Sequence, residues 1–194
     1  MANVAAAQSG EHIPGEAGVW VFILGDMVVF ALLFGAFVYY RAADVPLFAS
    51  AQLSLNQSLG ALNTLLLLLT SSWFVVHGVE AVRARRAALA RGLLAAAFSC
   101  GVGFMLVKYF EYGEKLRAGH SINSNDFFMY YYLLTGIHLL HVTIGMAVLA
   151  YLWQRLRNAA DIDAQLSAVE SGASFWHMVD ILWILLFALV YMMR

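Results

Sequence analysis

Long apolar runs separated by short polar segments make up almost the whole chain. Five such runs occur, and each is long enough to cross the ~30 Å hydrocarbon core of a bilayer as a helix. In lipid the backbone must satisfy its own hydrogen bonds, so the runs are predicted to be helices rather than open strands. The predicted spans are residues 17–40, 59–82, 92–116, 127–153 and 174–193.

No internal repeat, low-complexity tract or separate soluble domain interrupts these runs. The pattern therefore predicts an all-α integral membrane protein, with an N-terminal segment over residues 1–16 and one five-helix transmembrane domain over residues 17–194. Composition supports this class, because 62% of the residues are hydrophobic and only 12% are charged. The net charge of −1 says nothing about partners, and no basic tract suggests a nucleic-acid partner. No Lys or Arg precedes the first run, which differs from a signal peptide.

Basic residues predict the orientation of the helices, because they favour the cytoplasmic side of a membrane. Arginines cluster after the second and the fourth run, whereas the opposite loops hold fewer basic residues. The two clusters are Arg83, Arg85, Arg86 and Arg91, and Arg155 with Arg157. The N-terminus is therefore expected in the cytoplasm and the C-terminus outside. The connection between the first two runs, which contains Pro46 and Asn56, is expected to be a polar loop.

Small residues recur within the runs and are predicted to lie where helices approach closely, since lipid provides no hydrophobic reason for helices to associate. They are Gly18, Gly25, Gly35, Ala97, Gly101, Gly136 and Gly145.

Asp26 lies well inside the first run, where an ionisable side chain is costly and often functional. One interpretation is a carboxyl that exchanges protons or contacts a partner protein. The other is a neutral, hydrogen-bonded acid that fixes helix packing. Burial of a carboxyl is expensive in either role.

A second polar group is expected near the cytoplasmic ends of the second and fifth helices. His77 and Glu80 share one helix face, as do His177 and Asp180, because residues three apart are neighbours on a helix. The topology places both pairs at about one depth, with Asp26 slightly deeper. The cluster is interpreted first as a structural hydrogen-bond network between helices and second as a functional site.

Toward the outside, Lys108, Glu111 and Lys115 are expected to form a self-neutralising helix end, with the lysine stems reaching the interface. His138 and His141 adjoin on one face near the middle of the fourth helix, and with Glu111 they are expected in an interhelical or outer polar network. No other histidine lies at their depth to complete a bis-histidine haem site. A metal site needs three or four converging ligands, and no known ligand spacing is present, so no metal is expected. The lone Cys100 is expected to be a packing residue.

Several strings resemble subunit III of the haem–copper oxidases, the cytochrome c oxidase subunit III family. The resemblance runs in order along nearly the whole chain. The matching strings are GDMVVFALLFGAFVYYR, LNTLLLLLTSSWFVVHG, YFEYGE, TGIHLLHVTIGMAVL and FWHMVDILWILLFALVY. Longer members of that family have two further N-terminal helices, and its buried carboxyl is often a glutamate. The opening PGEAGVWVFILGDM, with Asp26 and the five-helix length, is more similar to the NorE branch, whose members accompany nitric oxide reductase in denitrifying bacteria.

The resemblance implies a non-catalytic accessory subunit in a bacterial inner membrane, without a cofactor of its own. Its partner would be the catalytic subunit of a nitric oxide reductase or, alternatively, of a cytochrome c or quinol oxidase, carrying haem with copper or non-haem iron. Such subunits stabilise the complex and help to supply it with protons, and some bind phospholipid. The family's lipid cleft needs the two further helices, so that site is not expected here. A stand-alone transporter or proton channel and a dihaem electron carrier are the alternatives of other classes.

Overall fold

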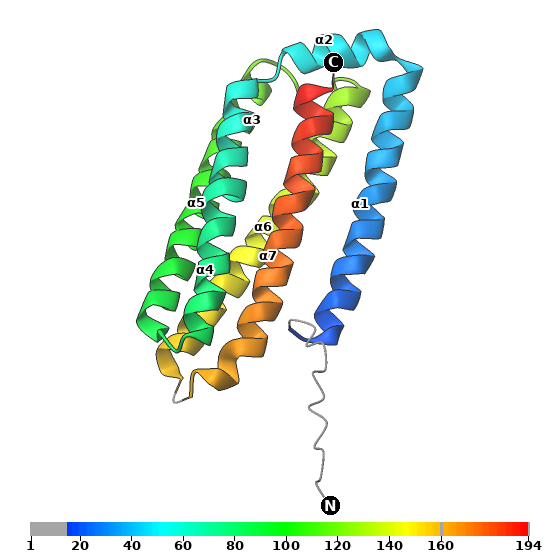
Figure 1. Ribbon diagram of the computed structural model, residues 1–194. Coiled ribbons are helices and arrows are strands. Elements are labelled where there is room, and N and C mark those ends of the chain that lie inside the picture. Colours follow the sequence, from blue (N-terminus) through cyan, green and yellow to red (C-terminus); the bar gives the residue numbers. More distant parts are fainter. Residues whose placement is uncertain (1–14, 160, 194) are drawn as a thin grey trace, which may run out of the picture.

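The computed structural model describes residues 15–159 and 161–193, and every regular element in that part of the chain is a helix (Figure 1). Five helical stretches are long and apolar enough to cross a membrane, which confirms the predicted class and number of spans. The elements are α1 (Ala17–Ala43), α2 (Val45–Leu53), α3 (Gln57–Thr64), η1 (Leu65–Ser71), α4 (Ser72–Arg83), α5 (Ala87–Arg117), α6 (Asp126–Asn158), η2 (Asp163–Gln165), α7 (Leu166–Phe187) and η3 (Ala188–Met192).

The second span is a continuous helix whose central part is π-helical, because α3, η1 and α4 follow one another without a break. The fifth span begins at α7, well before its predicted start at residue 174. The additional turns carry Glu170, whose buried carboxylate bonds to Arg83 of α4. A tertiary contact therefore supports helix in a segment whose polar residues had suggested a loop.

The N-terminal side of the bundle, defined as the end where α1 begins, also holds the α4–α5 turn and the connection from α6 to α7 (Figure 1). The described arginines after the second and fourth spans therefore lie on one side of the molecule, together with the start of α1. The C-terminus, α2 and the connection from α5 to α6 lie at the opposite end.

The predicted polar loop after the first span contains a short helix, α2, which lies across that opposite end (Figure 1). The Asp44 side chain caps it by accepting from the backbone N–H of Leu47 at 3.1 Å, and Pro46 occupies its first turn. These are favourable residues for a helix start. Phe48 packs between Phe37 of α1 and Phe127 of α6, so the connection is part of the core.

Side chains from three elements hold the C-terminal end of the chain. The last carbonyls of a helix have no partner within the helix. Here Gln52 of α2 donates to the Val190 carbonyl at 2.9 Å, and Gln57 of α3 donates to the Tyr191 carbonyl at 2.7 Å. Arg41 at the end of α1 donates to the Met193 carbonyl at 2.7 Å. The end of the fifth span is therefore fixed to the first two spans.

The centre of the bundle is α7, which lies between α1 and the α3–α5 layer (Figure 1). In its most apolar stretch 56% of the residues are buried, against 17% in α1, so α7 is central and α1 peripheral. Trp176 and Trp183 of α7 are fully buried. Their indole N–H groups donate to Ser71 at 2.9 Å and to Thr64 at 3.1 Å, which links α7 to the second span.

Close helix approach occurs at only some of the predicted small residues. A Cβ at Gly145 of α6 would lie 2.7 Å from the Trp176 ring, and one at Gly101 of α5 would lie 3.3 Å from the same ring. The expectation of close helix approach is wrong for four glycines, because a Cβ built on each would have no atom of another helix within 4 Å. These are Gly18, Gly25, Gly35 and Gly136.

We expect Gly145→Ala to destabilise the protein by about 1–3 kcal/mol, because the new methyl group overpacks against a fully buried Trp176 ring. Gly136→Ala on the same helix is the matched control, since nothing lies within 4 Å of its added Cβ. Thermal unfolding in mild detergent, followed by tryptophan fluorescence, measures both. Equal melting temperatures for the two variants would contradict the packing of α6 on Trp176.

Candidate functional site

Asp26 of α1 pairs with His141 of α6, and this is the polar contact that joins the peripheral helix to the bundle near mid-span. The Asp26 Oδ2 and His141 Nε2 atoms are 2.8 Å apart. His141 Nδ1 lies 2.8 Å from the Ile137 carbonyl, which can only accept, so Nδ1 carries a proton. The contact with Asp26 therefore holds a second proton, on either the carboxyl or the imidazole. This proton can move between the Asp26 carboxyl and the His141 imidazole without a change in the summed charge of the two side chains.

This pair lies at the seam between α1 and α6 and is not fully enclosed. The Asp26 side chain is 18% exposed and that of His141 is 10% exposed, while the ring of Phe30 packs edge-on against His141 at 5.4 Å. His141 makes a contact between helices, and Asp26 contacts α6 rather than the expected cytoplasmic cluster. Helical periodicity predicts which residues share a helix face, but it does not predict which face of α6 packs against α1.

A second polar group joins α4 to α7. Ser72 Oγ donates to Asp180 Oδ2 and lies 3.1 Å from His177 Nδ1. His177 Nδ1 is 3.8 Å from Asp180 Oδ2, so the two residues share a face as their spacing predicted. Asp180 is 2% exposed, and its Oδ1 atom has no hydrogen-bond partner among the described residues.

The Ser72 group contains the residue types of a hydrolase triad in an unsuitable arrangement. In such a triad the acid and the serine bond to opposite nitrogens of the histidine. Here Ser72 and Asp180 both lie on the Nδ1 side of His177, and Ser72 donates directly to the carboxylate. The geometry therefore links helices and does not activate Ser72 as a nucleophile.

His77 and Glu80 do not join this group as expected. His77 Nδ1 donates to the Trp73 carbonyl at 2.9 Å, and the His77 ring lies 4.0 Å from the Trp73 ring, so its observed partners are on its own helix. Glu80 is exposed and lines a surface pocket of about 200 Å³ that His177 also lines. His77 is thus separated from His177, although both lie toward the same side.

The same pocket contains an ion pair that the sequence did not suggest. Arg83 Nη2 lies 2.8 Å from Glu170 Oε1, and the backbone N–H of Gly15 donates to Glu170 Oε2 at 3.3 Å. The Glu170 side chain is 2% exposed. This carboxylate therefore fastens the end of α4 and the start of α1 to α7. In the sequence, Leu166 and Val169 precede Trp176 at a spacing typical of one helix face, and this pattern indicates that Glu170 lies in a helix rather than in a loop.

Lys108 and Glu111 form a fully buried ion pair, with Lys108 Nζ 2.8 Å from Glu111 Oε2 and exposures of 1% and 0%. Lys108 also donates to the Tyr191 hydroxyl at 2.6 Å. Glu111 Oε1 accepts from Tyr131 at 3.0 Å and from Tyr191. The Trp183 ring centroid lies 4.8 Å from Lys108 Nζ. The predicted pairing of Glu111 with a lysine of its own helix is present, but the expectation that the Lys108 stem reaches the interface is wrong, because α6 and α7 enclose both charges.

Lys115 belongs to a separate contact. Its ammonium donates to the Ser54 carbonyl at 2.5 Å and lies 3.2 Å from Glu114, so it joins the end of α5 to the end of α2. His138 is fully buried between Phe104 and Trp183. Neither ring nitrogen of His138 has a hydrogen-bond partner within the described part of the chain.

No three His, Cys, Asp or Glu side chains of the described residues converge closely enough to hold a metal ion. The predicted site residues instead form separate contacts that link α1 to α6, α4 to α7, and α5 to α6 and α7. Of these contacts, the Asp26–His141 pair combines an exchangeable proton with partial access from outside the bundle. We therefore regard it as the candidate functional site.

Comparison with known proteins gives one family. The family model for cytochrome c oxidase subunit III matches residues 8–194. Cytochrome c oxidase subunit 3 of Synechocystis is 32% identical over 196 residues, which cover 94% of this chain and 82% of the relative. Cytochrome bo(3) ubiquinol oxidase subunit 3 of Pseudomonas putida is 26% identical over 178 residues, covering 91% and 84%.

A third relative is much longer than this chain. The heme-copper oxidase subunit I+III of Aeropyrum pernix is 31% identical over 183 residues, which cover 91% of this chain but 22% of the relative. The chain therefore spans less than a quarter of that protein.

We expect Lys108→Met to destabilise the protein by about 3–5 kcal/mol, because it leaves the Glu111 carboxylate buried without its counter-charge. The double variant Lys108→Met/Glu111→Gln should recover most of this loss, since it removes both charges and keeps an acceptor for the two tyrosines. Thermal or chemical unfolding of the detergent-solubilised variants measures the change in stability.

The matched surface control is Arg85→Gln, which removes the exposed ion pair with Asp163 and should cost at most about 1 kcal/mol. If the double variant proved no more stable than Lys108→Met alone, the buried ion pair would not be the source of the loss.

Proposed function

The chain belongs to the cytochrome c oxidase subunit III family, and from this premise we propose that it is a non-catalytic accessory subunit of a respiratory haem–copper enzyme. It stabilises the catalytic subunit and assists its proton supply. The observation that carries this proposal is the family match over residues 8–194, together with relatives matched over most of their length. Haem, with copper or non-haem iron, belongs to the partner in this proposal.

The fused relative supports a direct partnership with the catalytic subunit. Its name combines subunits I and III in one chain, and a segment of it is similar to nearly all of this protein. Covalent fusion keeps two folded units at a high effective concentration, which suits units that already act together. The partner proposed for this chain is accordingly a haem-bearing subunit I-type protein in the same membrane.

The proposed role in proton supply concerns the Asp26–His141 pair. The contact shares one proton, lies well inside the first and fourth spans, and is partly open at the α1–α6 seam. Intramembrane acids and histidines that face a partner or an aqueous cavity are typical of proton relays. The pair can therefore pass a proton to a group of the partner that reaches the seam.

Two kinds of catalytic partner are candidates. Named relatives of similar length are subunits of cytochrome c and quinol oxidases, and this favours an oxidase. Asp26, which stands where much of the family has a glutamate, favours a nitric oxide reductase of the NorE type. The length of the chain does not distinguish an oxidase subunit from a NorE-type protein, because the match covers 84% of a quinol oxidase subunit.

We further propose that the protein lies in the bacterial cytoplasmic membrane with its N-terminus in the cytoplasm and its C-terminus in the periplasm. The support is the arginines on the N-terminal side of the bundle, since basic residues favour the cytoplasmic side.

Purification of the tagged chain from its native membrane in mild detergent tests the partnership. We expect haem absorbance and a subunit I-type protein in the eluate, identified by optical spectra and mass spectrometry. Copper with an oxidase subunit would establish the oxidase, whereas non-haem iron with a nitric oxide reductase subunit would establish the NorE-type function. A solitary, colourless protein would contradict both and would favour a transporter or an assembly factor.

Within the purified complex, Asp26→Asn tests the proton role. We expect unchanged haem spectra and a turnover reduced by about two- to tenfold, because the residue acts on the catalytic subunit from a distance. The deficit should grow as the pH rises, since protons then become limiting. Glu80→Gln, which removes an exposed acid on the N-terminal side, is the control and should leave turnover within twofold of the unmodified complex. A pH-independent deficit, or none, would count against proton supply through Asp26.

A further inference from the structure

Two pockets on the N-terminal side of the bundle meet at His177. The first lies between α1 and α7 and has a volume of about 270 Å³. The second lies between α4 and α7 and has a volume of about 200 Å³. Ser174 and His177 of α7 line both pockets, so these two side chains mark the junction between them. We call the combined space the His177 site; its α1–α7 arm is apolar and its α4–α7 arm is polar.

The apolar arm is suited to a flat aromatic ring. Trp20 of α1 supplies an aromatic side chain, and Met27 of α1 and Met178 of α7 supply thioethers, which contact aromatic rings favourably. The α1 wall of this arm runs from Trp20 to Met27, about 5–15 Å along the helix from its first residue. Rings with one apolar and one polar part favour this depth near a membrane interface. An aromatic ligand with a polar group therefore suits the apolar arm.

His177 presents a hydrogen-bond acceptor at the junction of the two arms. Its side chain is 33% exposed, and its Nδ1 atom lies 3.1 Å from Ser72 Oγ. Ser72 donates its own proton to Asp180, so the Ser72 oxygen accepts from the Nδ1–H group of His177. The Nε2 atom of neutral His177 is then an acceptor, and none of the described residues hydrogen-bonds to it. The site therefore offers a fixed acceptor to a ligand that carries an O–H group.

The polar arm disfavours an anionic headgroup. The carboxylates of Glu80 and Glu170 and the guanidinium of Arg83 line it. Arg83 lies 2.8 Å from Glu170, so the lining residues of this arm leave no unpaired cation for a phosphate group. Glu80 would also repel a second negative charge. A neutral headgroup that donates a hydrogen bond suits these charges better.

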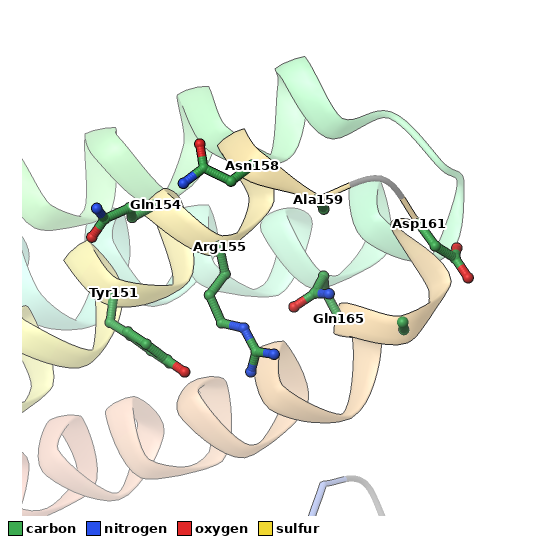
Figure 2. Close-up of a pocket in the computed structure, with 8 residues that line it drawn as sticks. Tyr151, Gln154, Arg155, Asn158, Ala159, Asp161 and Gln165 are labelled. Carbon is green, nitrogen blue, oxygen red and sulfur yellow. The ribbon is translucent and has the colours of Figure 1, made fainter.

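The polar pocket of about 480 Å³ at the end of α6 has the opposite character (Figure 2). Arg155 contributes a guanidinium to it, and Gln154, Asn158 and Gln165 contribute amide groups (Figure 2). An aromatic ring placed there would displace water from these groups without replacing its hydrogen bonds, which costs affinity. Of the two places, the His177 site is therefore the one suited to an apolar ligand.

We propose that the His177 site binds a membrane quinol, an aromatic ring with two hydroxyl groups and an isoprenoid tail. One hydroxyl donates to His177 Nε2, the ring lies against Trp20 and Met27, and the tail passes between α1 and α7 into the lipid. The oxidised quinone has carbonyl groups that only accept, so it lacks the donor that Nε2 requires. The site thus favours the reduced form. The proposal requires the membrane location and does not depend on which enzyme is the partner.

Photolabelling of the full-length chain in lipid nanodiscs tests the site. The probe is a ubiquinol analogue with a diazirine in its tail, kept reduced under anaerobic conditions. We expect labelled peptides from residues 20–27 of α1 and 174–182 of α7, identified by mass spectrometry. The same probe in its oxidised form, in a parallel sample, should need an about fivefold higher concentration for half-maximal labelling, the expected effect of one hydrogen bond between neutral groups.

Two pairs of variants test the two contacts separately. His177→Phe keeps a ring but removes Nε2, and it should raise the half-maximal concentration of the reduced probe about fivefold. His77→Phe is its matched control, because His77 bonds to the carbonyl of Trp73 on its own helix and lines neither pocket. Met27→Trp should reduce labelling by filling the apolar arm. Val28→Trp adds the same side chain at an exposed position outside the pocket and should not reduce labelling.

Three outcomes would overturn the proposal. Half-maximal labelling at the same concentration for the reduced and the oxidised probe would exclude the hydrogen bond to Nε2. Labelling spread over the lipid-facing helices, equal in the variants and their controls, would show that the probe only dissolves in the lipid. Loss of labelling at the two segments in the purified complex, compared with the chain alone, would show that the catalytic partner covers the His177 site.

Discussion

A charged side chain inside the bilayer has no water to bond, and this constraint shapes the bundle from within. Lys108 and Glu111 are therefore enclosed together, with the hydroxyls of Tyr131 and Tyr191 completing their hydrogen bonds. The same constraint acts on the backbone, because the last carbonyls of the fifth span would otherwise lack partners. Side chains from α1, α2 and α3 supply those partners, so the chain end and the buried ion pair stabilise one end of the bundle together.

The central position of α7 connects this interior to the rest of the molecule. Trp176 fills the space left by Gly101 of α5 and Gly145 of α6, and the N–H groups of Trp176 and Trp183 bond to the second span. The first span is the least buried of the five, and near its middle the Asp26–His141 pair joins it to α6. A polar pair at a partly open seam suits a helix that faces other components of the membrane.

Most of the fold followed from the sequence, because a run of about 20 apolar residues has one stable form in lipid. The number of helices, their order and the shared side of the two arginine clusters could all be predicted in this way. The short helix α2 was missed, although Asp44 and Pro46 are favourable residues for a helix start. The beginning of α7 was also missed, although the apolar spacing of Leu166 and Val169 continues the helical pattern toward Trp176, and the contact of Glu170 with Arg83 is visible only in the structure.

The sequence by itself determined the membrane class, the five spans, the family resemblance and which residues had to be polar inside the membrane. The tertiary structure alone decided that Asp26 pairs with His141 and Asp180 with Ser72, and that the Lys108–Glu111 pair, expected from helical spacing, is buried in the interior. The physical reason is that helical periodicity fixes the face on which a residue lies. The rotation and relative depth of packed helices, by contrast, depend on side chains from all five spans at once, and these decide which faces meet.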